Sequence, residues 1–92
     1  MAKELIFRSH AIQRMFERRI TGENVRDVLN NGIIIEDYPD DTPYPSKLVL
    51  GWCGGRPIHV VVAHNPVADE DVVVTVYEPE YASWTSDFKR RR

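Results

Sequence analysis

The hydrophobic pattern changes its period at Gly32, and this change constrains the fold more than any other feature. Before Gly32, apolar residues recur every three or four positions, which is the period of an amphipathic helix. After Gly32, runs of β-branched residues are separated by turn residues, which is typical of strands. A helical part followed by a β part predicts an α+β domain.

The helical part is predicted to be a hairpin of two helices over residues 9–31. Ser9 is the expected N-cap of the first helix, and Thr21 is the expected N-cap of the second. Only about two residues separate the helices, which favours an αα-hairpin. Gly32 is expected to end the second helix in the left-handed conformation that glycine adopts at little cost.

The β part, residues 33–78, is predicted to form four consecutive strands. Helices that precede a meander pack on one face of it, so the expected architecture is a helical hairpin on a four-stranded antiparallel sheet. Residues 4–7 suit either a short strand or a lead-in. In the C-terminal segment, residues 79–92, aromatic residues are spaced by three and four positions, which would suit a short closing helix.

A chain of 92 residues fits a single domain over residues 1–92. The apolar runs are too short to cross a bilayer, and the N-terminus has no apolar signal core. Cys53 is the only cysteine, which fits a reducing compartment. We therefore expect a cytoplasmic protein that does not contact a membrane. No metal-ligand spacing such as Cys-x-x-Cys is present, so no metal and no other cofactor is expected.

The charge is slightly negative, with 12 basic and 14 acidic side chains and a net charge of −2. Most nucleic-acid-binding domains are more basic. The charges are unevenly distributed, however, because arginines crowd the N-terminal fifth, residues 89–92 are all basic, and acid collects in residues 36–41. The sequence therefore allows a local basic surface but excludes a globally basic one.

The first candidate site lies on one face of the first predicted helix. His10, Arg14 and Arg18 follow at spacings of four, opposite the apolar stripe, and Glu17 lies beside them. A guanidinium presents a fork of donors that suits phosphate, so this face could bind a phosphate group. The alternative is an ordinary solvated face with pairs between neighbouring turns.

The second candidate site lies on the predicted sheet. His59 interrupts a strand of Ile and Val, and Thr75 and Tyr77 share one face of the last strand. These polar groups either line an open site or are satisfied by ordinary hydrogen bonds. Several aromatic side chains could stack on bases, although core packing is their commoner fate: Trp52, Tyr77, Tyr81 and Trp84.

Three stretches of the chain resemble the domain-of-unknown-function family DUF4258, in matching order and spacing. They are Ser9-His10-Ala11-x-x-Arg14-Met15-x-Glu17-Arg18-x-Ile20-Thr21 with Asp27-Val28-Leu29 and Gly32, then Arg56-Pro57-x-His59-Val60-Val61-Val62, and Thr75-Val76-Tyr77-Glu78-Pro79 with Trp84. Arg19 departs from the pattern, because relatives often carry glycine there. The helix would then end on a left-handed arginine or in a different turn.

The resemblance extends, at the level of layout, to small metal-independent ribonucleases of the RelE, ParE and BrnT type in the barnase–EndoU–colicin–RelE class. It implies a ribonuclease-like toxin of a toxin–antitoxin system, with RNA as substrate and a cognate antitoxin as partner. Carried over by position, the catalytic candidates are His10, Arg14, Arg18, His59, Thr75 and Tyr77. Arg8, Arg19 and Trp84 are the candidates for substrate binding.

Metal-free cleavage of RNA needs a base for the 2′-hydroxyl, an acid for the leaving oxygen and cations for the transition state. Either histidine could supply the base or the acid. The alternative function is a binding module without catalysis, whose polar face recognises a small protein or forms a homodimer. A small DNA-binding regulator is the third reading, although no recognition helix with base-reading side chains is evident.

Overall fold

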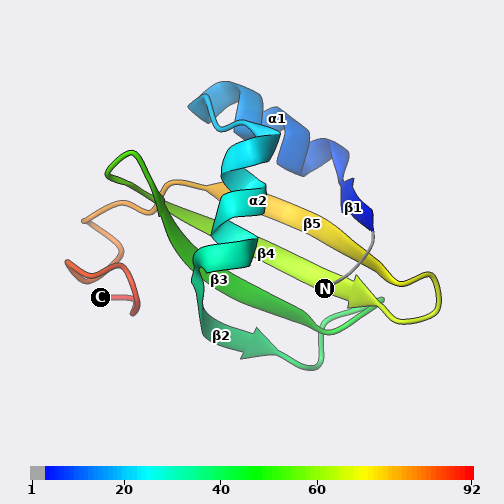
Figure 1. Cartoon of the computed structure of the whole chain (residues 1–92). Coiled ribbons are helices and arrows are strands. Elements are labelled where there is room, and N and C mark those ends of the chain that lie inside the picture. The colour runs from blue at the N-terminus through cyan, green and yellow to red at the C-terminus, as the bar shows by residue number, and fades with distance from the viewer. Residues whose placement is uncertain (1–3) are drawn as a thin grey trace.

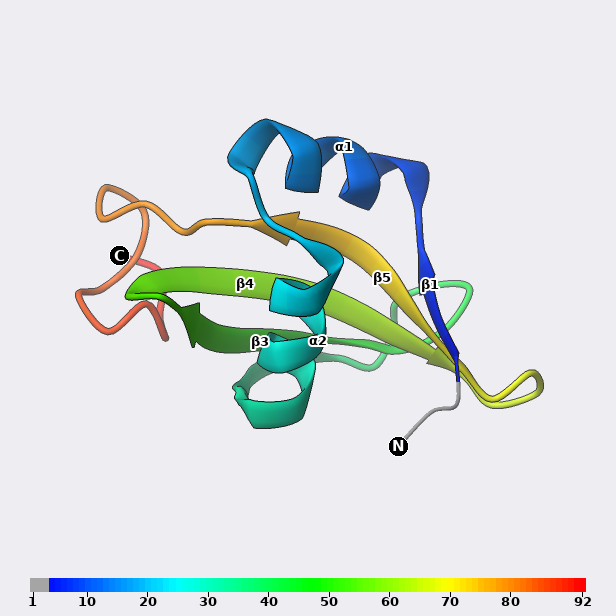
Figure 2. The same ribbon diagram turned by 45° about the horizontal axis from the view of Figure 1, so that its top comes forward.

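The computed structural model describes residues 4–92 and shows two helices on one face of a five-stranded sheet (Figure 1). The elements follow one another as β1 (Glu4–Phe7), α1 (Ser9–Arg18), α2 (Gly22–Asn31), β2 (Ile33–Tyr38), β3 (Ser46–Cys53), β4 (Arg56–Asn65) and β5 (Glu70–Tyr77). The C-terminal segment lies at the end of the sheet where the β3–β4 turn is found, as both ribbon views show (Figures 1 and 2). None of the described helices has the length and apolar character needed to cross a membrane.

The sheet has the order β1-β5-β4-β3-β2 and is mixed. Strands β2 to β5 form the antiparallel meander, but β1 adds a fifth strand that runs parallel to β5 and pairs with its residues 70–73. The α+β class is therefore correct, and the four-stranded antiparallel sheet is wrong. Four residues are too few to show a strand period, and β1 is defined by the backbone of a strand far along the chain.

The two predicted helices are confirmed, and one of the two predicted N-caps is correct. Thr21 caps α2 as expected, because its hydroxyl accepts the Asn24 backbone N–H at 3.1 Å and the Asn24 side chain accepts the Thr21 N–H at 3.0 Å. This reciprocal pair is a capping box. Ser9 is instead the first residue of α1, and Arg8 occupies the N-cap position without a side-chain hydrogen bond.

Gly32 does end α2, but not through the expected left-handed conformation. Its φ of −79° and ψ of −177° are extended values that any residue adopts. A Cβ at this position would lie 2.4 Å from the carbonyl oxygens of Val28 and Leu50. Glycine is therefore required here by the close approach of the chain to β3, and not by its backbone torsions.

Arg19 ends α1 in the left-handed conformation, with φ 54° and ψ 46°, which is the first of the two outcomes allowed by the sequence. A side chain in this conformation costs roughly 1–2 kcal/mol. We predict that Arg19→Gly raises the free energy of unfolding by about 0.5–1 kcal/mol, because glycine removes the strain but adds chain entropy. Urea unfolding measures this gain. The matched control Arg26→Gly, on the exposed side of α2, should lose about 1 kcal/mol; a loss in both variants would contradict the prediction.

Two hydrophobic clusters lie on opposite faces of the sheet. The larger cluster packs α1 and α2 on the sheet through residues such as Ala11, Val28 and Val60. The smaller one joins Leu48 and Leu50 of β3 to Trp84 and Phe88 of the C-terminal segment. The segment therefore covers part of the second face of the sheet.

The closing helix expected in this segment is absent from the structure of residues 79–92. Turns connect short stretches, and Trp84 and Arg91 form an isolated bridge. Phe88 adopts a left-handed φ of 60°, which is incompatible with a continuing right-handed helix. Trp84 and Phe88 are anchored on the sheet and Tyr81 is exposed, so the aromatic spacing does not mark one face of a helix.

Candidate functional site

A hollow of about 390 Å³ lies between α1, the end of β5 and the C-terminal segment. Strand β1 pairs only with residues 70–73 of β5, so the remainder of β5 extends past it beneath α1. We call this site the arginine hollow. It is lined by His10, Arg14 and Arg18 of α1, by Thr75 and Tyr77 of β5, and by Glu78, Pro79, Glu80, Ser83, Trp84 and Arg91.

The polar face of α1 forms one wall of the arginine hollow. His10, Arg14 and Arg18 follow at one helical turn from each other, and all three side chains are exposed. Arg14 lies 3.9 Å from Glu17 in a solvent-exposed pair, which contributes little energy and leaves the guanidinium free to take another partner. The structure thus brings the α1 residues of the first candidate site into one hollow with Thr75 and Tyr77 of the second candidate site.

His59 belongs to the same region but does not line the arginine hollow, because it is fully buried beneath it. Its Nε2 lies 2.9 Å from the Phe88 carbonyl oxygen, and its Nδ1 lies 3.2 Å from the Tyr77 hydroxyl. A carbonyl oxygen only accepts, so Nε2 carries the proton and donates it. In the neutral ring Nδ1 then accepts the hydrogen bond of the Tyr77 hydroxyl.

Burial keeps both partners of this hydrogen bond uncharged. Desolvation lowers the pKa of His59 below its ordinary value of 6.5, and Arg91 lowers it further, while the bond to Phe88 opposes the shift. Burial also raises the pKa of Tyr77 above 10.0. Tyr77 is half-buried and does line the hollow, so it links the buried imidazole to the open site. His10 and His59 therefore do not share one open site.

The low pKa of His59 makes the stability of the fold depend on pH. The unfolded chain binds a proton at His59 near pH 6.5, whereas the folded chain binds it only at lower pH, so acid favours the unfolded state. The stability that the fold gains from keeping His59 neutral is fully present above about pH 6.5 and is lost as the pH falls below this value. We predict that urea unfolding of His59→Gln, which keeps a donor and an acceptor, shows a flatter decline than the wild type between about pH 6.5 and 5. Equal declines in both proteins would contradict this assignment.

Trp84 and Arg91 form the wall contributed by the C-terminal segment. The Trp84 side chain is only 3% exposed and meets the His59 ring edge-on at 4.4 Å. The Arg91 guanidinium lies 4.6 Å from the centre of the Trp84 ring, which is a cation–π contact. Trp84 is thus covered: it packs in the smaller hydrophobic cluster and contacts Arg91 at the hollow. The sequence pointed to Arg91 only through the basic run at residues 89–92.

Arg56 and Glu78 form a clip that sequence analysis missed. Arg56 donates from Nη2 to the Arg18 carbonyl at 2.7 Å and from Nη1 to the Arg19 carbonyl at 3.2 Å, while Nε and Nη2 both reach Glu78 Oε1. The guanidinium thereby satisfies carbonyls that the end of α1 leaves without helical partners. The clip fixes Arg18 relative to the end of β5. Both residues stand in the motifs that carry the family resemblance, which was the available signal.

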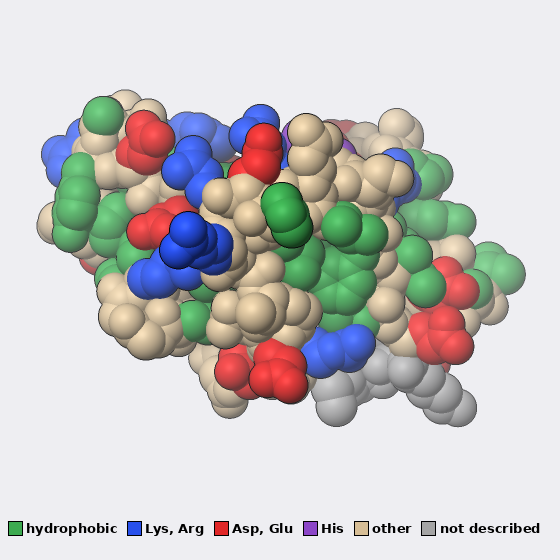
Figure 3. All heavy atoms as spheres, turned by 90° about the horizontal axis from the view of Figure 1, so that it is seen from above, with side chains coloured by type: hydrophobic (Ala, Val, Ile, Leu, Met, Phe, Trp, Pro, Cys, Tyr) green, Lys and Arg blue, Asp and Glu red, His purple; other side chains and the backbone are tan. Residues whose placement is uncertain are grey.

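Two residues expected to bind substrate lie outside the lining of the arginine hollow. Arg8 precedes α1, where its backbone N–H donates to the Val73 carbonyl at 3.1 Å. Arg19 occupies the left-handed turn that ends α1. Figure 3, seen from the helix side, shows basic and acidic side chains interspersed over the surface, so the positive charge of the hollow is local.

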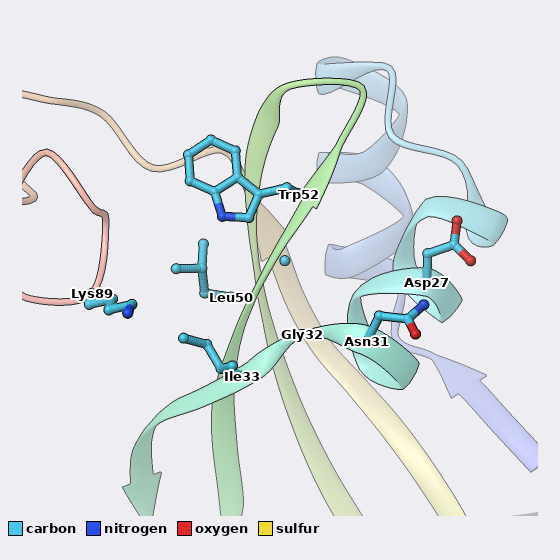
Figure 4. A pocket seen from close by; sticks show the side chains of 8 residues that line it. Asp27, Asn31, Gly32, Ile33, Leu50, Trp52 and Lys89 are labelled. Atoms are coloured by element: carbon cyan, nitrogen blue, oxygen red, sulfur yellow. The ribbon is translucent and has the colours of Figure 1, made fainter.

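A second hollow, at the start of β2, does not gather its polar groups. Figure 4 shows Trp52, Leu50, Ile33 and Lys89 on one side of β3, with Asp27 and Asn31 on α2 on the other side. Side chains that do not converge offer no common ligand position. Within residues 4–92, no cluster of three or more His, Cys, Asp or Glu side chains is arranged to hold a metal ion.

The comparisons with known proteins identify one family. The model described as "Domain of unknown function (DUF4258)" matches residues 7–78, which include the α1 and β5 walls of the arginine hollow. No curated protein and no solved structure matches the chain. The likeness in layout to ribonucleases of the RelE type therefore stays a prediction.

Proposed function

The chain belongs to the DUF4258 family, whose description names no activity, and we propose from its arginine hollow that it is a metal-independent ribonuclease. The observation that carries this proposal is the convergence of Arg14, Arg18 and Arg91 with the exposed imidazole of His10 and the phenol of Tyr77. Guanidinium groups bind phosphate oxygens, and they stabilise the extra negative charge of a five-coordinate phosphorus in the transition state.

The side chains of the hollow suffice for cleavage by the 2′-oxygen of RNA. His10 takes the proton of the 2′-hydroxyl, the 2′-oxygen attacks phosphorus, and the bond to the 5′-oxygen breaks to give a 2′,3′-cyclic phosphate. The Tyr77 hydroxyl gives up its hydrogen bond to His59 Nδ1 and donates its proton to the leaving 5′-oxygen. Solvent then takes the proton from His10 and returns one to Tyr77. Tyr77 is protonated at neutral pH, as an ordinary tyrosine is, and burial raises its pKa further. Thr75 lies beside Tyr77 in the wall and positions the substrate with it.

The negative net charge of the protein does not oppose this role, because the substrate needs only a local cationic patch. Glu78 is neutralised by its ion pair with Arg56 at 2.9 Å. The proposal includes the biological role that the resemblance implies, which is a cytoplasmic toxin held in check by an antitoxin. This role predicts that expression of the protein arrests bacterial growth and that mutation of the arginine hollow relieves the arrest.

The test is cleavage of a mixed-sequence RNA by the purified protein in EDTA. We expect the wild type to produce 2′,3′-cyclic phosphate ends, and His10→Ala to be slower by about 10²–10⁴-fold because it lacks the base. Gln13→Ala is the matched control, since Gln13 is exposed on α1 but does not line the hollow. Equal rates for wild type and His10→Ala, or no cleavage by a protein that circular dichroism shows to be folded, would contradict the proposal.

The second candidate function is a protein-binding module without catalysis. It is favoured by an exposed apolar patch on α1, where Phe16 is 87% and Ile12 54% exposed. Large apolar side chains that are exposed next to each other often mark a site of protein–protein interaction. A folded protein without RNA affinity that co-purifies with one small protein, or that dimerises, would favour this function.

A further inference from the structure

A further hollow of about 550 Å³ adjoins the arginine hollow and shares part of its lining. Arg18, Glu78, Pro79 and Glu80 line both of them. On the far side lie Trp52 of β3, the β3–β4 turn and Tyr81 of the C-terminal segment. We call this space the aromatic hollow. A ligand that fills the arginine hollow can therefore continue into the aromatic hollow past Arg18.

Two large aromatic side chains are open to solvent at the aromatic hollow. The Trp52 side chain is 55% and the Tyr81 side chain 66% exposed. Both rest on the ring of Phe88, Trp52 at a centroid distance of 5.8 Å and Tyr81 at 4.8 Å. Phe88 is itself only 2% exposed. A buried ring thus supports two exposed ones, which limits the entropy that their side chains would lose on binding a flat ligand.

We propose that the aromatic hollow binds an unstacked base of single-stranded RNA whose neighbouring phosphate lies in the arginine hollow. This inference rests on the proposed function and names its substrate class. Aromatic rings stack on bases of any sequence, and a cationic groove beside them holds the backbone. Arg18, which lines both hollows, is placed to contact the phosphate between them. In a duplex the bases stack on each other and cannot reach Trp52 or Tyr81, so double-stranded RNA is a poor ligand.

Affinity is measured from the fluorescence anisotropy of a dye-labelled four-nucleotide 2′-O-methyl RNA, which cannot be cleaved by its own 2′-oxygen, so that variants without Trp52 can be compared with the wild type. The chain has two tryptophans, and only Trp52 is exposed, so we expect the RNA to quench the fluorescence of Trp52 and the signal to vanish in Trp52→Phe. Trp52→Ala and Tyr81→Ala should each weaken binding by roughly tenfold, whereas Trp52→Phe should retain most of the affinity. Phe16→Ala is the control, because Phe16 is exposed but lines neither hollow.

Salt dependence separates this inference from the proposed function. Trp52→Ala should leave the slope of affinity against salt unchanged, while Arg18→Ala should reduce it, because only the arginine releases counterions from the RNA. Binding that depends on Arg18 but not on Trp52 or Tyr81, or equal affinity for an RNA duplex, would overturn the inference and leave the proposed function standing. Binding that depends on the two aromatic residues, without cleavage of unmodified RNA, would support the inference and overturn the catalysis. No binding by the folded wild type would overturn both.

Discussion

Replacing Phe88 by alanine is expected to lower the free energy of unfolding by about 3–5 kcal/mol, the usual cost of removing a buried aromatic ring. Phe88 is 2% exposed and belongs to the cluster that holds the C-terminal segment on Leu48 and Leu50. Its carbonyl also accepts the Nε2–H of His59. Loss of the ring loosens the segment and weakens the hydrogen bond between His59 and the carbonyl of residue 88, so we expect a loss near the upper end of this range.

Urea unfolding monitored by circular dichroism measures this effect. Phe88→Leu is the matched variant, since it keeps a large apolar side chain at the same backbone position and should lose clearly less stability. Amide hydrogen exchange shows whether the segment opens alone or the whole sheet unfolds. A loss below about 1 kcal/mol in Phe88→Ala would show that the segment does not stabilise the sheet.

Removing Arg14 and Arg18 together is expected to slow RNA cleavage by about 10³–10⁴-fold. Loss of a single group that stabilises transition-state charge costs about 10²–10³-fold, and two groups acting on one phosphate are not additive. Most of the loss should appear in kcat, because the charge on the phosphate oxygens grows in the transition state. The stability of the fold should change little, since both side chains are exposed.

Arg26→Ala is the control for the arginine pair, because it removes a positive charge from α2 at an exposed position that does not line the hollow. If Arg26→Ala slowed cleavage as much as the pair, general attraction between charges would explain the effect. If the double variant cleaved RNA as fast as the wild type, the active site could not lie in the arginine hollow.

The helices and the meander could be predicted because their patterns are local. Apolar spacing places α1 and α2, the capping side chain of Thr21 marks where α2 begins, and the turn at residues 53–56 separates β3 from β4. Residues 4–7 form the short strand that the sequence left open as one alternative, but the parallel pairing of β1 with β5 could not be predicted, because it joins segments far apart in the chain. The irregular structure of residues 79–92 was not predicted for a related reason. Trp84 and Phe88 pack where the sheet offers apolar contacts, and their spacing does not follow from a helix.

Much of the candidate site followed from the same local patterns. Helical spacing put His10, Arg14 and Arg18 on one face, and strand alternation put Thr75 and Tyr77 on another, and these faces meet in the arginine hollow. Alternation also placed His59 on the face of Tyr77, but it could not show that the C-terminal segment covers this imidazole. Arg91 and the Arg56–Glu78 clip depend on contacts between distant segments, which no local pattern encodes.

The pairing of the first strand with the last one has a consequence for the order of folding. Strand β1 pairs with β5, so the sheet is completed only by contacts between residues far apart in sequence. Such contacts form slowly. Synthesis produces the arginines of α1 long before β5 and Arg91, and the arginine hollow needs all three. The nascent chain therefore carries the arginines of α1 before their site exists, and any activity of the hollow begins only after Arg91 has been added and the chain has folded.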